Sequence, residues 1–175
     1  MSVTNSVMEA LGNAGYNKQT ALKVMIQSTD SSVLMKLREK TSYELVYKVK
    51  ENIRDALNQT IEDIKKFADS VVLSKESVYP LNSAFITSAT DIVQRLQSFK
   101  LPVYVETFSN EFVSQAWDFF SDPTVEINTY YEGAGIDGVI TEFPMTAVRY
   151  RSKLVRKHTS LCLYGAGIHF VLKVC

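Results

Sequence analysis

Histidine and cysteine are the residues that this chain has least of. Its two histidines are His158 and His169, so residues 1–157 contain no imidazole. An acid–base mechanism that needs histidine must therefore use the C-terminal end of the chain, or it is absent. The two cysteines, Cys162 and Cys175, have no metal-type spacing and give no disulfide framework.

An excess of charge of one sign is also missing. The 19 basic and 19 acidic residues cancel to a formal net charge of +0. A surface for nucleic acid or an anionic membrane normally needs a basic excess, so the composition argues against both partners. Lysine and arginine do gather between residues 149 and 157, and we interpret this stretch as a solvated helix face or linker.

The sequence has neither a long apolar run nor a recognisable targeting signal. No stretch approaches the ~18–20 apolar residues of a membrane span. The first residues lack the basic and apolar regions of a secretory signal, so we expect no signal peptide. The composition, 46% hydrophobic and 22% charged, is that of one ordinary globular domain.

What the chain does have is a regular alternation of helical patterns and short apolar runs. The β-rich runs predict five strands, over residues 23–28, 43–49, 70–74, 102–108 and 138–142. Apolar spacing predicts helices over 4–15, from about residue 31, and over 59–68, 88–98, 110–120 and 145–157. Asp30 or Ser31 is a candidate cap for the second helix, and Thr60 for the third.

This alternation predicts an α/β fold. Strands that are short and apolar throughout are typical of a parallel sheet covered on both faces. Right-handed crossovers would give either an open doubly wound sheet or part of a (β/α)₈ barrel. Five strands would leave two open sheet edges, through which the chain could associate with itself. The apolar segment after Lys157 breaks the alternation and is apolar enough to form a strand.

The most distinctive stretch runs from Gly133 to Pro144, with the sequence GAGIDGVITEFP. Its G-x-G-x-x-G spacing has the letters of a dinucleotide fingerprint, but that fingerprint follows a strand and opens a helix. Here the glycines precede a strand. We therefore interpret them as a loop that enters a buried strand, where glycine supplies a positive φ or close packing.

Polar residues lie at or near the C-terminal ends of the predicted strands. In a parallel barrel these ends meet at one mouth, which is the functional face. Glu106 and Glu142 could share a cation or hold a hydroxylated substrate there. A carboxylate at a strand end can equally be solvated or paired with lysine. The predicted substrate-facing residues are Gln27, Ser28, Lys48, Lys75, Glu106, Thr141 and Glu142.

Two further features have modest structural explanations. Asn58-Gln59-Thr60 is a glycosylation sequon, which matters only in a protein that enters the secretory route. Trp117, together with Phe112, Phe119 and Phe120, could form an exposed aromatic patch. The helical spacing favours burial in the core, and we expect these aromatic residues to be core residues.

The stretches NEFVSQAWDFF, from Asn110 to Phe120, and GVITEFP, from Gly138 to Pro144, resemble the plant glycerophosphodiester phosphodiesterase-like family, whose members are cell-surface proteins with tandem domains and a lipid anchor. The resemblance runs from about residue 3 to about 151 and corresponds to the C-terminal part of one domain. We therefore divide the chain into residues 1–152, part of the barrel domain, and residues 153–175, a divergent apolar tail.

The resemblance implies a TIM (β/α)₈ barrel, of which this chain holds about the last five βα units. It also implies a divalent cation, usually Ca²⁺, and two histidines that hydrolyse a glycerophosphodiester to glycerol 3-phosphate and an alcohol. The family's His-Arg, Glu-Asn-Thr and Glu-x-Asp motifs have no counterpart here, so no catalytic or metal-binding residue is assigned. Glu106-Thr107 stands where many members have Trp-Thr. We therefore expect little or no activity from this chain alone. The alternatives are a non-catalytic cell-surface interaction module and a truncated gene product.

Overall fold

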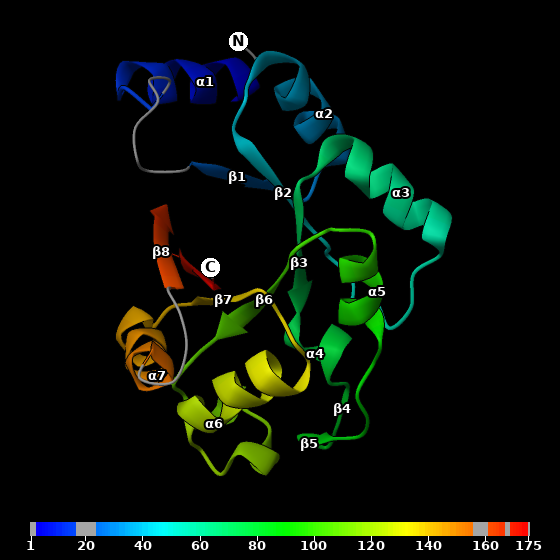
Figure 1. Cartoon of the computed structure of the whole chain (residues 1–175), viewed down its shortest axis with the longest axis vertical. Coiled ribbons are helices and arrows are strands. Elements are labelled where there is room, and N and C mark those ends of the chain that lie inside the picture. The colour runs from blue at the N-terminus through cyan, green and yellow to red at the C-terminus, as the bar shows by residue number, and fades with distance from the viewer. Residues whose placement is uncertain (1–2, 17–23, 156–160, 167–168, 175) are drawn as a thin grey trace.

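The computed structural model describes residues 3–16, 24–155, 161–166 and 169–174, with side chains over 5–16 and 24–151. Five parallel strands follow one another in the order β1-β2-β3-β6-β7 and form a curved sheet (Figure 1). This confirms the predicted α/β fold and its resemblance to part of a barrel. The five strands are β1 Met25–Ser28, β2 Glu44–Lys48, β3 Ser70–Ser74, β6 Val103–Phe108 and β7 Gly138–Thr141.

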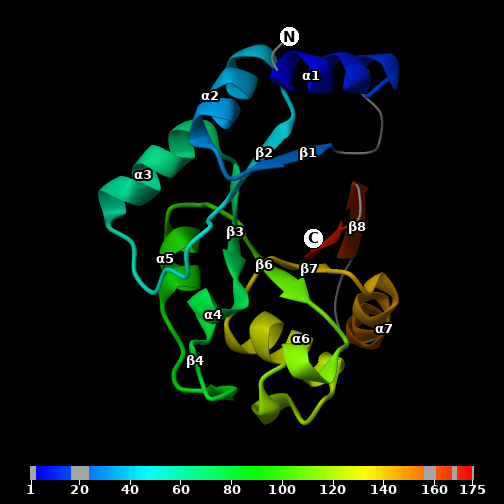
Figure 2. The same cartoon turned by 180° about the vertical axis from the view of Figure 1, so that it is seen from behind.

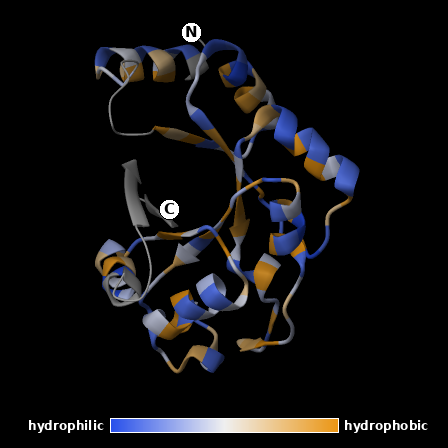
Figure 3. Cartoon of the chain, viewed as in Figure 1, coloured by the Kyte–Doolittle hydropathy of each residue, from blue (hydrophilic) through white to orange (hydrophobic). Residues whose placement is uncertain are grey.

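The main helices lie on the convex side of the sheet (Figures 1 and 2). Their apolar sides pack on the strands, which is why the apolar colour in Figure 3 is concentrated on the strands and on the inward helix faces. The helices are α1 Val3–Asn13, α2 Ser31–Lys40, α3 Asn58–Phe67, α5 Ile92–Ser98, α6 Pro123–Asn128 and α7 Pro144–Val155.

Side chains of each central strand alternate between two apolar layers. In β3, Val71 and Leu73 are buried in the large cluster that includes helix residues, whereas Val72 belongs to a second cluster without them. In β6, Val103 and Val105 alternate in the same way with Tyr104. Because both faces are buried, these strands read as continuous apolar runs rather than alternating ones.

Helix starts agree with the sequence at α2 but not at α3. Asp30 caps α2, accepting a hydrogen bond from the Ser32 backbone N–H at 2.8 Å. These hydrogen bonds from Ser32 lower the pKa of the Asp30 carboxyl. The prediction that Thr60 caps α3 is wrong, because that helix begins at Asn58 without a side-chain cap. Asn58 Oδ1 accepts instead from the Arg95 guanidinium at 3.4 Å.

The predicted helix over residues 110–120 is also wrong. The segment forms two short 3₁₀ helices, η1 Phe112–Ser114 and η2 Trp117–Phe119. Phe120 and Ser121 then adopt positive φ values of 53° and 61°, which no continuing helix allows. The polar sequence Glu111, Ser114, Asp118 and Asp122 supplies turn formers, and these override the apolar spacing.

Helix α6 and three smaller elements were not expected. A short helix, α4 Lys75–Val78, follows β3 directly, with Ser74 as its cap. A two-stranded hairpin, β4 Leu81–Asn82 and β5 Phe85–Ile86, comes next. A π-helical turn, η3 Thr129–Gly133, continues α6.

The glycine-rich entry to β7 has the role expected from its sequence. Gly135 has a φ of +73°, which glycine adopts without the penalty of a side chain. A Cβ atom on Gly133 would lie 3.0 Å from the Tyr79 hydroxyl, so this position is closely packed. The stretch is a loop that leads into a buried strand.

The C-terminal segment adds an antiparallel hairpin to the sheet. Strand β9, His169–Val174, pairs with β7, and β8, Leu161–Ala166, pairs with β9. The expectation of an open edge at β7 is therefore corrected, because β9 pairs with it; the end strands of the described sheet are β1 and β8. Helix α7 continues across the boundary that we placed after residue 152.

Candidate functional site

The concave face of the sheet carries an apolar layer with polar side chains beyond it. Val46, Val72, Tyr104 and Ile140 form a buried cluster there, and Met25 packs against it. Residues two positions further along a strand share its face and lie nearer its C-terminal end. By this alternation, the next layer towards the strand ends contains Gln27, Lys48, Ser74 and Glu106.

Within this layer, Lys48 of β2 and Glu106 of β6 form an ion pair across β3. The Lys48 side chain is 37% exposed and the Glu106 side chain 14%. The sequence left open whether Glu106 holds a ligand with Glu142 or pairs with lysine, and the structure shows the pairing. One charge of each sign therefore faces the concave side.

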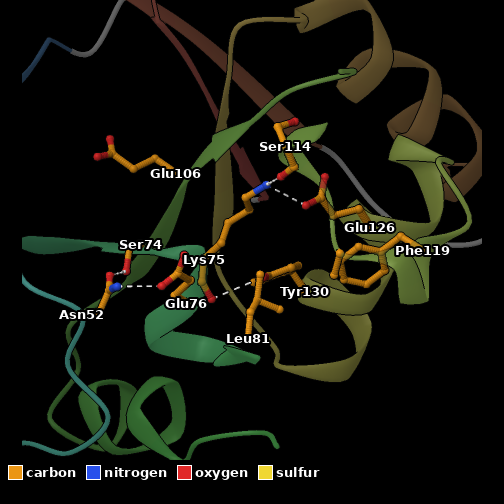
Figure 4. Close-up of a pocket in the computed structure, with 11 residues that line it drawn as sticks. Asn52, Ser74, Lys75, Glu76, Leu81, Glu106, Ser114, Phe119, Glu126 and Tyr130 are labelled. Atoms are coloured by element: carbon orange, nitrogen blue, oxygen red, sulfur yellow. Dashed lines mark hydrogen bonds and ion pairs between the residues drawn. The ribbon is translucent and has the colours of Figure 1, made fainter. Parts of the chain in front are cut away.

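A cavity of about 210 Å³ lies at the C-terminal ends of β3 and β6 (Figure 4). It is formed by the loop after β2, by α4, by the 3₁₀ segment and by α6. Of the predicted site residues, it brings together Lys75 and Glu106. Its polar and aromatic lining comprises Asn52, Ser74, Lys75, Glu76, Glu106, Ser114, Phe119, Glu126 and Tyr130.

Lys75 and Glu126 form the most buried charged pair of this site. Lys75 Nζ donates to Glu126 Oε1 and to the Ser114 carbonyl oxygen, both at 2.8 Å, and lies 5.7 Å from the centre of the Phe108 ring. Only 1% of the Glu126 side chain is exposed. Burial raises the pKa of the Glu126 carboxyl, and the attraction of Lys75 opposes that shift.

Tyrosine hydroxyls fix the backbone around this pair. Tyr130 donates a hydrogen bond to the Lys75 carbonyl oxygen at 3.2 Å, and its ring meets the Tyr79 ring edge-on at 4.9 Å. Burial raises the pKa of Tyr130, and the nearby carboxylate of Glu126 raises it further. Tyr130 therefore stays a neutral donor and is not an acid or base near neutral pH.

A second polar network forms the other side of the cavity. Ser74 Oγ donates to Asn52 Oδ1 at 2.5 Å, and Asn52 Nδ2 donates to Glu76 Oε2 at 2.8 Å. Ser74 also accepts a hydrogen bond from the Ser77 backbone N–H, which caps α4. These contacts hold the loop after β2 against the end of β3.

Four other predicted site residues do not line this cavity. Thr141 is 2% exposed, donates to the Phe108 carbonyl oxygen at 2.9 Å and accepts from the Phe143 N–H at 2.9 Å, so it ties β7 to β6. Ser28 accepts from the Asp30 N–H at 3.0 Å. Gln27 and Glu142 are exposed. For these residues, contact with a ligand stays a prediction, as does glycosylation of Asn58, which is exposed at the start of α3.

Sequence reasoning missed Asn52, Glu76 and Glu126 of the cavity. For Glu126 a signal was available, because Asp122-Pro123 is a helix start, with Asp122 capping the Thr124 N–H at 2.7 Å and Pro123 at the first position. Recognising that start would have placed Glu126 on α6. Asn52 lies on a loop and carries no comparable signal.

The carboxylates of the described residues do not gather into a metal site. Three glutamates line the cavity, but Glu106 pairs with Lys48, Glu126 with Lys75, and Glu76 accepts from Asn52. Within residues 5–16 and 24–151, no group of three histidine, cysteine, aspartate or glutamate side chains could hold a metal ion. The described residues therefore assign no reaction step to Ca²⁺.

Comparison with known proteins identifies the family of the chain. Residues 2–146 match the model of the glycerophosphoryl diester phosphodiesterase family. The chain belongs to this family. It is 57% identical to the glycerophosphodiester phosphodiesterase GDPDL3 of Arabidopsis thaliana over 161 residues and 57% identical to GDPDL1 over 152 residues. It is also 53% identical over 152 residues to the Arabidopsis protein SUPPRESSOR OF NPR1-1 CONSTITUTIVE 4.

These matches cover most of this chain but a small part of each relative. They span 91%, 86% and 86% of the chain, against 21%, 20% and 14% of the three relatives. The chain thus spans about a fifth of the length of the first two phosphodiesterases it matches. Among the helices that the structure describes, none has the length and apolar character needed to cross a membrane.

Proposed function

We propose that this chain forms one wall of a barrel that hydrolyses glycerophosphodiesters to glycerol 3-phosphate and an alcohol. The observation that carries the proposal is the family match over residues 2–146 together with the cavity at the C-terminal strand ends. In parallel α/β barrels this end of the sheet binds the substrate.

Lys48 is the residue that we assign to the substrate phosphate. Its side chain is 37% exposed and lies on the concave face, whereas Lys75 is 18% exposed and is held by Glu126 and Ser114. A phosphodiester anion can replace the Glu106 carboxylate as the partner of Lys48, because the lysine ammonium is a point charge on a flexible side chain. Lys75 positions the loops around the cavity.

The chain alone lacks the other components of the reaction. Hydrolysis of a phosphodiester needs a proton donor for the leaving oxygen, and residues 1–157 contain no histidine. The three glutamates that line the cavity already have partners in Lys48, Lys75 and Asn52. We therefore propose that the acid, the base and the cation site belong to other parts of a longer protein, and that this chain has little or no activity by itself.

The test is the release of glycerol 3-phosphate from glycerophosphocholine in the presence of Ca²⁺. We expect none from the purified chain, and expect activity from a fusion that adds the preceding strands of a homologous family barrel. In that fusion, Lys48→Met should raise KM for the substrate, whereas Lys65→Met, on the exposed side of α3, should not. Robust Ca²⁺-dependent activity of the chain alone, or an unchanged KM for Lys48→Met, would contradict the proposal.

A non-catalytic role through self-association is the second candidate. It is favoured by β1, which lies at the end of the sheet and pairs with β2 on one side. An unpaired strand edge is a template for a strand from another chain. Light scattering tests this candidate: a dimer that Ile26→Pro dissociates supports it, and a concentration-independent monomer argues against it.

A further inference from the structure

The loops around the cavity expose apolar side chains at an unusual density. We call six of them the apolar rim; two come from the β4–β5 hairpin and four from the segment after β6. Val113 is 90% exposed and Phe120 is 86% exposed, so these two protrude from the surface. The apolar rim consists of Leu81, Phe85, Phe112, Val113, Trp117 and Phe120.

The two parts of the apolar rim meet at Phe85 and Trp117. The Phe85 and Trp117 rings are in contact, with their centres 5.3 Å apart. The Trp117 N–H donates to the Ala84 carbonyl oxygen at 2.9 Å, and the Ile86 N–H donates to Asp118 Oδ2 at 2.8 Å. The hairpin and the 3₁₀ segment are thus joined by one backbone–backbone and one backbone–side-chain hydrogen bond, which hold the two segments together.

The charges around the apolar rim limit what it can bind. Residues 101–148 contain no lysine or arginine, and residues 76–100 contain only Arg95 and Lys100. Anionic lipid and nucleic acid need basic contacts, which this region does not supply. The carboxylates of Glu111, Asp118 and Asp122 would also repel the phosphates of these two ligands.

A basic protein partner would require these carboxylates to be available. Asp118 accepts the Ile86 N–H, and Asp122 caps α6 through the Thr124 N–H at 2.7 Å. Both carboxylates therefore have a structural function within the loop. The protruding side chains of Val113 and Phe120 have no such structural function. An apolar partner therefore explains their exposure better than a basic one.

A carbohydrate partner does not fit the ring geometry. Aromatic platforms for sugars present coplanar faces, whereas the Phe85 and Trp117 planes make an angle of 65°. Protruding aromatic and aliphatic tips without basic residues match the interface of a zwitterionic bilayer, where tryptophan is favoured and apolar tips enter the acyl region.

We propose that the apolar rim docks on a zwitterionic phospholipid surface and turns the mouth of the cavity toward it. Ser114, Ala116 and Phe119 line the cavity, and their neighbours in sequence form the rim. A molecule that leaves the lipid surface would therefore meet the cavity first. This inference does not rest on the hydrolytic function, since docking needs no catalysis.

Trp117 makes the test direct, because it is the one tryptophan of the chain and lies in the apolar rim. The purified chain is titrated with phosphatidylcholine vesicles, and Trp117 fluorescence and vesicle co-flotation are measured. We expect a blue shift and co-flotation, with weaker binding when phosphatidylserine is included. The double variant V113D/F120D should bind at least about tenfold more weakly, while L57D, which changes an exposed apolar residue that does not belong to the rim, should bind as the unaltered chain does.

Each other outcome overturns the proposal. Absence of binding, or equal binding by V113D/F120D, shows that the rim does not dock on lipid. A blue shift with an oligo-arginine peptide but not with vesicles identifies a basic protein as the partner. A shift that grows with protein concentration alone identifies a second copy of the chain. Circular dichroism and the thermal midpoint establish that the variants are folded, which we expect because both altered side chains are exposed.

Discussion

At the scale of single residues, the Lys75–Glu126 pair has the largest expected influence on stability. Glu126 is 1% exposed, and Lys75 is the cation that compensates its charge. Breaking a buried ion pair from one side leaves an uncompensated charge, which typically costs about 3–5 kcal/mol. Replacing both partners avoids that penalty.

We therefore expect Lys75→Met to lower the free energy of unfolding by about 3–5 kcal/mol, and expect K75M/E126Q to recover most of the loss. Urea denaturation at pH 7 measures both. The exposed pair Lys66–Asp63 is the matched control, because Lys66→Met removes a solvent-screened ion pair and should leave the free energy of unfolding nearly unchanged. Equal losses in K75M and K75M/E126Q would contradict this account.

The same carboxyl group makes stability depend on pH. Burial raises the pKa of Glu126 above its ordinary value of 4.5. In the unfolded chain this group loses its proton near pH 4.5, whereas in the folded chain it keeps the proton to higher pH. Its contribution to stability is thus fully present below pH 4.5 and is lost as pH rises through the folded pKa.

The denaturation midpoint should accordingly fall less steeply with rising pH, from pH 4 upwards, in Glu126→Gln than in the unaltered chain. The steeper fall should extend to higher pH in Lys75→Met, because removing the ammonium raises the pKa of Glu126 further. Identical pH profiles for the three proteins would show that Glu126 titrates alike in the folded and unfolded states.

At the scale of elements, the segment between β6 and α6 separates adjacent residues into core and surface. Phe119 is 3% exposed and packs in the core beside Tyr130, with ring centres 6.2 Å apart, whereas Phe120 is 86% exposed. The 3₁₀ turn and the positive φ of Phe120 cause this separation.

Phe119→Ala should lower the free energy of unfolding by about 3–5 kcal/mol, because it removes a buried ring. Phe120→Ala should change it by no more than about 0.5 kcal/mol. Chemical denaturation of the two variants provides a matched comparison of neighbouring phenylalanines. Similar effects would contradict the division into one buried and one exposed ring.

The elements differ in how far the sequence determines them. The five parallel strands could be predicted for two reasons. Strands β3, β6 and β7 are largely buried and contain apolar runs, and β2 is rich in strand-forming residues. The segment over 110–120 could not, because its apolar spacing fits a helix while its Ser, Asn and Asp side chains favour turns. Likewise Lys75 and Glu106 were predictable from their place at strand ends, but their partners Glu126 and Lys48 depend on which loops and strands meet in space.

At the scale of the whole molecule, the parallel part of the sheet, from β1 to β7, has two different ends. The β7 end is covered by β9, whose residues 170–173 pair with residues 138–141 in antiparallel register. The β1 end carries no further strand of the part of the chain that the structure describes. The covered end protects a short apolar strand from contact with other chains.

Removing residues 156–175 should therefore uncover β7 and increase self-association. Light scattering at rising concentration compares the truncated and full chains, and circular dichroism reports whether the α/β fold is retained. We expect the truncated chain to form larger species at lower concentration. A truncated chain that stays folded and monomeric would show that the β7 edge needs no cover.

The hairpin at β7 also implies a choice between two neighbours. In a closed barrel, the final strand completes the ring by bonding in parallel to the first. Here the same backbone N–H and C=O groups of residues 138–141 already bond to a strand that runs the opposite way. Ring closure at β7 and pairing with β9 are therefore mutually exclusive, so a closed barrel that contains this wall requires β9 to lie elsewhere.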